Sequence, residues 1–195
     1  MTAVLRLPVG SAPEPEPGVV EAAQKGERWA QAQIVEWYAR PVWSLVCRVL
    51  GRAGRRGAAE DATQEALVAA LESLPRFCPA RARSLKAWML TIAARTAVDV
   101  LRRQRDVVEV DEASMPSHDR PDVTAERRAL ARAIESAVET LSPEIRAAFV
   151  LRAYHEFEYA QIAEALGIDL GTVKSRLWRA RAALQRSLAE VRRDA

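Results

Sequence analysis

The residues best suited to binding chemistry lie near the C-terminus, in the segment GTVKSRLWRARAALQRSL that begins at Gly171. No acidic residue occurs between Asp169 and Glu190, so the positive charge of this segment is not locally balanced. Its basic residues, with one just beyond it, are Lys174, Arg176, Arg179, Arg181, Arg186 and Arg192. Lys and Arg side chains reach phosphates and guanine edges, while Ser and Trp can contact base edges or thymine methyl groups. The segment therefore favours binding to DNA.

The same segment has an apolar stripe, which indicates how it is held in place. The stripe has helical spacing and consists of Val173, Leu177, Ala180 and Leu184. The opposite side presents Gly171, Ser175, Trp178 and Arg179, with Lys174 and Arg176 beside them. A helix that is packed on one side and cationic on the other suits the major groove of DNA. The alternative is a helical hairpin whose basic face is only solvated.

A short helix is expected before this segment, followed by a glycine. Helical spacing (i, i+3, i+4, i+7) relates its apolar residues Tyr159, Ile162, Ala163 and Leu166. Gly167 follows where a helix end needs a positive φ, and Asp169 can cap the next helix. A small residue, a turn residue and an apolar anchor thus occur in the order that a helix-turn-helix needs.

The chain has 195 residues and a formal net charge of +3. Residues 1–105 carry 16 basic and 10 acidic side chains, residues 106–126 carry one and seven, and residues 127–195 carry 12 and nine. Two basic blocks thus flank an acidic connector. We expect no metal and no cofactor, because metal-ligand spacing and catalytic pairing are absent among Cys47, Cys78, His118 and His155. Without a long apolar run or a signal peptide, we expect a cytoplasmic protein with no membrane insertion.

The elements that would position the basic segment are all helical. A proline-rich stretch without apolar periodicity predicts a disordered tail over residues 1–18. Periodic apolar residues predict further helices at 19–50, 58–74, 85–105, 125–141 and 143–154. Because no stretch shows the alternation of a strand, we predict an all-α fold. It would consist of two small helical domains joined by a flexible acidic linker at 106–126.

Three longer stretches resemble one family. LSPEIRAAFVLRAYHEFEYAQIAEALGIDLGTVKSRLWRARAAL is similar to the C-terminal domain of bacterial RNA polymerase sigma factors of the extracytoplasmic-function (ECF) group. AEDATQEALVAALESLPRF resembles a conserved helix of the family's N-terminal domain, and SLKAWMLTIAARTAVDVLRRQR resembles its promoter-melting segment. The resemblance implies a region 2 domain at 19–105 and a region 4 domain at 127–195. It also implies a transcription initiation factor that is not an enzyme.

The resemblance implies partners and binding residues as well. Core RNA polymerase would use the clamp helices of its largest subunit to contact Asp61, Gln64 and Glu65, and its flap is a further expected contact. Promoter DNA at the −35 element would contact Thr172, Lys174, Ser175, Arg176, Trp178 and Arg179. DNA at the −10 element would be held and melted by Phe77, Arg81, Arg83, Lys86, Arg95, Arg102, Arg103 and Arg105. Because family members are commonly held by an anti-sigma factor, such a partner is expected too.

Three residues depart from the family's usual pattern. Glu158 stands where Ser or Thr usually caps the first helix of the helix-turn-helix, Leu90 where an aromatic is frequent, and Arg95 where Asn is frequent. Arg has only donors, so Arg95 would bind phosphate or a guanine edge, or else point to solvent or pair with Asp99. Phe77 also has two interpretations, since it would either pack against an unstacked base or belong to the core.

Two other classes of function remain open from the residues alone. A free-standing helix-turn-helix regulator would explain only residues 141–188. A nucleic-acid enzyme would need a supported nucleophile or a carboxylate metal site. Asp61 and Glu65 lie one turn apart on a predicted helix, but no third acidic residue is clustered with them.

Overall fold

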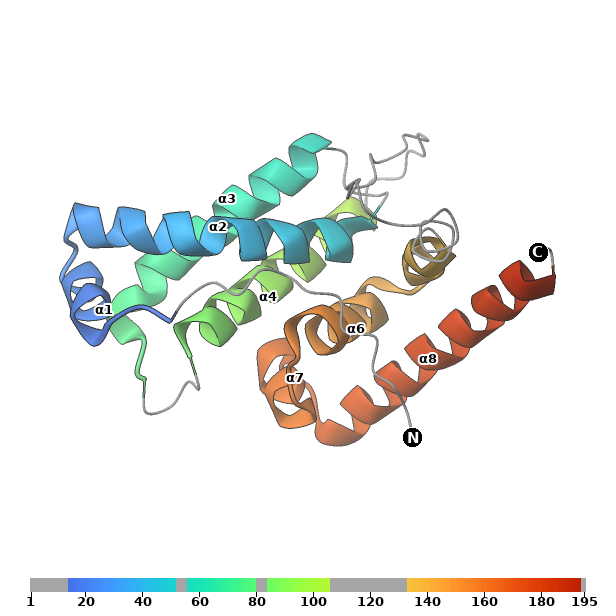
Figure 1. Cartoon of the computed structure of the whole chain (residues 1–195). Helices are drawn as coiled ribbons and strands as arrows, with labels where there is room; N and C mark the ends of the chain where they lie inside the picture. The colour runs from blue at the N-terminus through green and yellow to red at the C-terminus, as the bar shows by residue number, and fades with distance from the viewer. Residues whose placement is uncertain (1–13, 52–55, 80–83, 106–132, 194–195) are drawn as a thin grey trace.

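The computed structural model of the protein describes residues 14–51, 56–79, 84–105 and 133–193. Every regular element in these ranges is helical, which confirms the predicted all-α fold (Figure 1). In chain order the elements are α1 (Pro17–Gln24), α2 (Arg28–Leu50), α3 (Arg56–Ser73), the 3-10 turn η2 (Leu74–Arg76), α4 (Leu85–Arg105), α6 (Pro143–His155), α7 (Tyr159–Leu166) and α8 (Leu170–Arg193). Residues 133–139, ahead of α6, are also helical. None of the helices described is both long enough and apolar enough to cross a membrane.

Helices α2, α3 and α4 form a bundle in which each helix contacts the other two (Figure 1). Small side chains line the contacts, among them Ala62 and Ala66 on α3 and Ala93 and Ala97 on α4, all at most 2 % exposed. Alanine lets helices approach closely, so the bundle is densely packed. It fixes the positions of α3 and α4, which carry the predicted polymerase and −10 residues.

The prediction of one helix over residues 19–50 is wrong. The chain turns between α1 and α2, where Gly26 has a φ of +86° that an uninterrupted helix does not allow. The side chain of Gln24 then ties α1 to the segment that follows α3. Its amide nitrogen donates hydrogen bonds to the carbonyls of Leu74 (3.1 Å) and Phe77 (2.7 Å).

Other predicted boundaries agree more closely with the structure. The helix predicted at 85–105 has those bounds in the structure, and α3 differs from its prediction by two residues at the start and one at the end. α1 begins at Pro17, two residues inside the predicted tail. Residues 1–13 of that tail, the linker at 106–126 and the start of the helix predicted at 125–141 lie outside the described residues.

The two halves of the chain share a core in this structure. α6 packs against α2 and α4, and α7 packs against α4. A single apolar cluster runs from Val46 and Val49 on α2 to Ala147 and Leu151 on α6, all of them inaccessible to solvent. The sequence predicted two domains connected by a linker, and no periodicity indicated that their helices would pack together.

Candidate nucleic-acid and polymerase interfaces

The turn between α7 and α8 has helix-turn-helix geometry. Gly167 follows α7 with a φ of +63°, and the Ile168 N–H donates to the Ala163 carbonyl at 3.0 Å. Asp169 caps α8, because its carboxylate accepts hydrogen bonds from the hydroxyl (2.5 Å) and the N–H (2.8 Å) of Thr172. These two hydrogen bonds, the hydroxyl's foremost, lower the pKa of Asp169. The predicted cap and the predicted glycine turn are both confirmed.

The departure at Glu158 leaves the start of α7 intact. Its backbone N–H donates to the side-chain oxygen of Gln161 at 2.7 Å, which satisfies a group that the helix cannot pair internally. Its carboxylate lies 3.4 Å from the guanidinium of Arg152 on α6. A glutamate at this position therefore supports the helix that precedes the turn.

α8 is packed on one side only. The buried side consists of the predicted stripe residues Val173, Leu177 and Ala180, each at most 3 % exposed. Of the predicted −35 residues, four are exposed and two are partly buried: Lys174, Ser175, Trp178 and Arg179, then Thr172 and Arg176. Trp178 is 70 % exposed, which is unusual for so large an apolar ring. The exposed side of α8 thus combines cations with a flat aromatic surface.

The predicted polymerase residues Asp61, Gln64 and Glu65 are all exposed on α3, at positions that share one face. Glu65 is paired with α4, because the guanidinium of Arg103 donates to both of its carboxylate oxygens, at 3.1 and 3.3 Å. The Arg103 and Glu65 side chains are 63 % and 52 % exposed, so the pair contributes little to stability. A predicted polymerase contact and a predicted DNA contact therefore touch each other.

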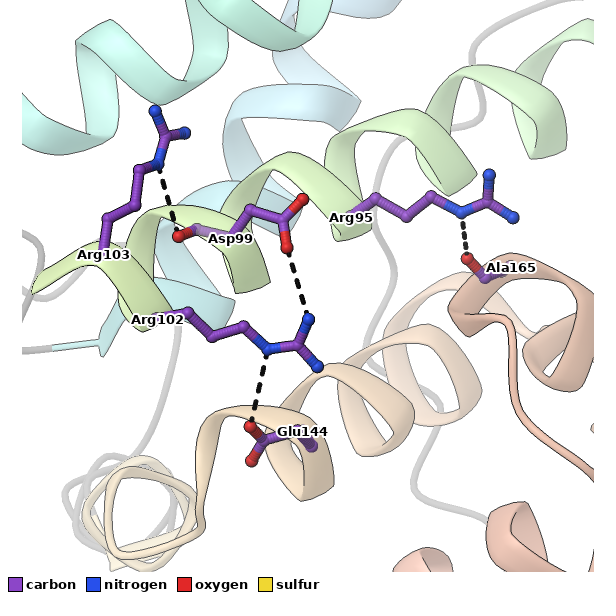
Figure 2. A network of polar contacts seen from close by, with 6 residues as sticks. All are labelled: Arg95, Asp99, Arg102, Arg103, Glu144 and Ala165. Atoms are coloured by element: carbon purple, nitrogen blue, oxygen red, sulfur yellow. Dashed lines mark hydrogen bonds and ion pairs between the residues drawn. The ribbon is translucent and has the colours of Figure 1, made fainter. Parts of the chain in front are cut away.

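Arg95 on α4 reaches across to α7 (Figure 2). Its Nε donates to the carbonyl of Ala165 at 2.6 Å, and its Nη2 donates to the carbonyl of Glu164 at 2.8 Å. Asp99, one of the alternative partners considered for Arg95, instead lies 3.5 Å from Arg102. Arg95 therefore binds backbone oxygens at the end of α7, an arrangement that the sequence did not indicate.

The remaining −10 residues on α4 have other surroundings. Arg102 also approaches Glu144 of α6 at 4.0 Å, so it too faces the C-terminal half (Figure 2). Lys86 is partly buried near the start of α4. Arg81, Arg83 and the side chain of Arg105 lie outside the described residues.

Phe77 has two interpretations from the sequence, and the structure places it in the core. It is 7 % exposed, and its ring lies 5.2 Å from that of Trp88, between centroids. Leu90, which stands where an aromatic is frequent, is 1 % exposed and packs in the core shared by the two halves. These residues hold the start of α4 against the bundle.

Family models divide the chain in the same way. The model described as Sigma-70 region 2 matches residues 34–107, and the model described as Sigma-70, region 4 matches residues 131–184. The ECF RNA polymerase sigma factor SigL of Mycobacterium tuberculosis is 35 % identical over 176 residues, which cover 88 % of this chain and 96 % of SigL. The chain belongs to the ECF sigma factors. It is a transcription initiation factor that directs RNA polymerase to promoters.

Other sigma factors are similar in sequence and in fold. SigW of Bacillus subtilis is 28 % identical over 184 residues, covering 88 % of this chain and 96 % of SigW. The sigma factor RpoE of Bartonella quintana, solved in complex with the anti-sigma factor NepR, has a TM-score of 0.65 at 25 % identity and covers 81 % of this chain and 96 % of its own. CnrH, solved with the cytosolic domain of CnrY, has a TM-score of 0.61 at 25 % identity, with coverages of 88 % and 96 %.

One arginine at the contact between regions 2 and 4 of this sigma factor was missed by the sequence analysis. Arg146 on α6 is 7 % exposed, and burial lowers its pKa. Its Nη1 donates to the carbonyls of Val49 and Leu50 at 3.1 Å each, and its Nη2 donates to those of Glu139 (2.6 Å) and Leu141 (3.1 Å). The only signal in the sequence was a charged residue within the apolar run of α6.

His155 also faces the other region. Burial, followed by the positive charges of Arg48 on α2 and Lys86 on α4, lowers its pKa to about 3. It lines a cleft of about 290 Å³ between the start of α4 and the turn after α6. Neither ring nitrogen has a hydrogen-bond partner in the described structure. The imidazole of His155 is therefore neutral at neutral pH. No group of three or more His, Cys, Asp or Glu side chains suited to a metal occurs in the part of the chain that the structure describes.

Proposed function

We propose that this sigma factor divides promoter recognition among three helices. In this scheme α3 binds core RNA polymerase, α4 holds the −10 element and helps to melt it, and α8 reads the −35 element. The observation that carries the proposal is the one-sided packing of α8, which leaves its cationic face and Trp178 in solvent. Because this face of α8 is already exposed, it can contact DNA without a rearrangement of the helix.

The dimensions and chemistry of α8 support a major-groove role. The groove is about 12 Å wide and admits one α-helix. The first turns of α8 carry Ser175 and Arg179 beside Trp178, and such positions contact base edges when a recognition helix docks. Lys174 and Arg176 flank them and are placed to reach phosphates, which give affinity without sequence preference.

For the −10 element, the chemistry is that of single-stranded DNA. Cations neutralise the phosphates of an opened strand, and a fixed pocket accepts an unstacked base. The arginines Arg95, Arg102 and Arg103 on α4, with Lys86, would form this track, together with Arg81, Arg83 and Arg105. Phe77 would support the start of α4 from the core.

We also infer partners and location. RpoE was solved in complex with an anti-sigma factor, and a comparable partner is proposed for this chain. The proposed scheme places the protein in the cytoplasm, where polymerase and promoters are. It assigns binding and strand separation to the chain and no covalent chemistry of its own, so we propose that it is not an enzyme.

Run-off transcription with purified core RNA polymerase tests the proposal. The wild-type protein should give promoter-specific transcripts, whereas a free-standing regulator would bind DNA and give none. A variant with Asp61→Lys and Glu65→Lys should bind core at least about tenfold more weakly, since about 1.4 kcal/mol corresponds to one decade. The matched control is Glu36→Lys with Glu72→Lys, which reverses two exposed carboxylates on α2 and α3 outside the patch.

Two outcomes would contradict the scheme in different ways. Absence of promoter-specific transcripts with wild-type protein and active core would contradict the assigned function. Equal core binding by the patch variant and the control would leave the function standing and remove the role of α3.

A further inference from the structure

An acidic residue ahead of α1 binds the start of the helix that we propose holds the −10 strand. The carboxylate of Glu14 accepts a hydrogen bond from the backbone N–H of Leu85, the first residue of α4, at 3.3 Å. The two residues are 71 positions apart in sequence. Burial raises the pKa of Tyr38 on α2, and the negative charge of Glu14 raises it further. Since Tyr38 and Leu85 belong to one apolar cluster, Glu14 lies at the edge of that cluster, beside both α2 and α4.

The position of this carboxylate has a physical reason. The first N–H groups of a helix have no intrahelical acceptor and carry the positive end of the helix dipole, so an anion is stabilised there. Ser84 caps α4 from within the chain, because its hydroxyl oxygen accepts from the N–H of Ala87 at 3.0 Å. The N–H of Leu85 is bound by Glu14, which comes from outside the helix. Helix N-termini bind phosphate groups through the same donors. The carboxylate of Glu14 thus occupies a position that also suits a DNA phosphate.

This end of α4 belongs to the proposed −10 surface. Lys86, one of its proposed cations, directly follows Leu85. A negative charge beside these groups acts against the binding of a DNA strand in two ways. It fills the acceptor position at the helix end, and it repels phosphates that approach the neighbouring cation. The net effect of Glu14 on the −10 strand is therefore unfavourable.

The contact of Glu14 is of a kind that a phosphate can replace. Glu14 is exposed, and 3.3 Å is long for a hydrogen bond to a charged acceptor. The residue lies outside α1, since the chain is still extended at Glu16 (φ −59°, ψ 144°) and the helix begins at Pro17. Exchange of the carboxylate therefore requires no helix of the bundle to unfold.

We propose that Glu14 is a resident anion at the start of α4, which competes with a phosphate of the −10 strand and lowers the affinity for that strand. In the bound state the phosphate takes the place of the carboxylate at the N–H of Leu85. This inference rests on the proposed role of α4. It assigns to the segment ahead of α1 a part in setting how strongly the sigma factor holds an open promoter.

The test uses holoenzyme reconstituted from the full-length protein and core RNA polymerase. A fluorescent −10 single strand, from a promoter that this holoenzyme transcribes, is titrated at about 0.1 M salt. Glu14→Gln should raise the affinity about threefold, because the amide oxygen still accepts from Leu85 but carries no charge. The matched control is Glu16→Gln, an exposed glutamate whose side chain makes no cap hydrogen bond to α1. Its affinity should equal that of the wild type.

Further measurements separate competition from a general change in the protein. The gain in Glu14→Gln should shrink at about 0.5 M salt, where exposed charges are screened within a few ångströms. Affinity for a −35 duplex should stay at the wild-type value, because Glu14 contacts α4 and α8 is the proposed reader of that element. In NMR spectra of the free protein, the amide resonance of Leu85 should move in Glu14→Ala and keep its position in Glu16→Ala.

Equal −10 affinity of the Glu14→Gln and Glu16→Gln holoenzymes at low salt would overturn the competition proposal. Lower affinity in Glu14→Ala would overturn it as well, because Glu14 would then support the start of α4 instead of competing with DNA. Failure of the wild-type holoenzyme to bind the −10 strand or to give promoter-specific transcripts would instead contradict the proposed function.

Discussion

α4 and α8 are both cationic helices that we propose bind promoter DNA, yet their arginines have different surroundings. Arg179 on α8 is exposed, and no acid occurs on this helix before Glu190. On α4, Arg95 binds carbonyls of α7 and Arg103 binds the carboxylate of Glu65. Residue type alone therefore identifies what an arginine is able to bind, whereas packing decides which partner it has in a given state.

The contacts of the arginines also differ in how much they contribute to stability. Ion pairs between exposed side chains contribute about 0–1 kcal/mol, so the contacts of Arg102 and Arg103 are easily replaced by phosphate contacts. Arg146 is different, because it is 7 % exposed and donates to four backbone carbonyls, three of them in buried hydrogen bonds. Removing a partner from buried polar groups costs about 1–3 kcal/mol for each group left unsatisfied. The contacts of Arg146 are thus costlier to break than those of Arg102 and Arg103.

The largest effect is expected on the open helix. Arg179→Ala should cost about 1–3 kcal/mol at one base position of the −35 element, if this arginine makes a bidentate base contact. Arg181→Ala is the matched control, because the Arg181 guanidinium lies 3.4 Å from the Tyr159 hydroxyl, toward α7. Binding selections on randomised −35 duplexes with each variant provide the measurement.

One outcome would contradict the proposed difference between α4 and α8. If wild type, Arg179→Ala and Arg181→Ala select the same −35 sequences, α8 binds only the phosphates of the DNA. Its exposed face would then add affinity without specificity, as proposed for the cations of α4.

A somewhat smaller effect is expected on stability when the pH is lowered, and it originates at His155 in the cleft between α4 and α6. The pKa of His155 is lowered to about 3 in the folded protein, from an ordinary value of 6.5. The unfolded chain therefore binds one more proton between these two values, and stability falls as the pH drops through 6.5. Between pH 7 and pH 5 this loss should reach at most about 2 kcal/mol. The charged and titratable groups around the ring are Arg48 of α2, Lys86 of α4 and the neighbouring Glu156.

Urea unfolding of wild type and His155→Gln at the two pH values measures this effect. The variant should lose less stability than wild type over the same interval, since it lacks the titrating group. Equal losses in both proteins would mean that His155 is hydrated in solution and that regions 2 and 4 do not cover it.

Local signals predicted the parts of the site that depend on neighbouring residues in the chain. The cap by Asp169, the turn at Gly167 and the packed side of α8 all follow from spacings within one or two helical turns. The sequence did not identify Gly26 as a helix break, because a single glycine within a long stretch of helical apolar spacing is not sufficient to predict a turn. Ala165, which accepts from Arg95, and Val49, which accepts from Arg146, lie 70 and 97 residues away in sequence, so no local pattern encodes these two contacts.

The smallest effect concerns Glu65 and Arg103, which connect the proposed polymerase face of α3 to the proposed DNA face of α4. A double-mutant cycle with Glu65→Gln and Arg103→Gln should give a coupling of about 0.2–1 kcal/mol in the free protein, because both side chains are more than half exposed. The coupling should fall at about 0.5 M salt, where exposed charges are screened within a few ångströms. Urea unfolding supplies the four stabilities, and Glu65→Gln combined with Arg102→Gln is the control pair.

The proposed roles of α3 and α4 require the coupling between Glu65 and Arg103 to be weak. If Glu65 turns to polymerase, Arg103 must be released at little cost to bind the opened strand. A coupling above about 2 kcal/mol that persists at high salt would instead make the pair a fixed part of the bundle. Arg103 would then not be available to DNA, and the −10 track on α4 would have to be reassigned to its remaining cations.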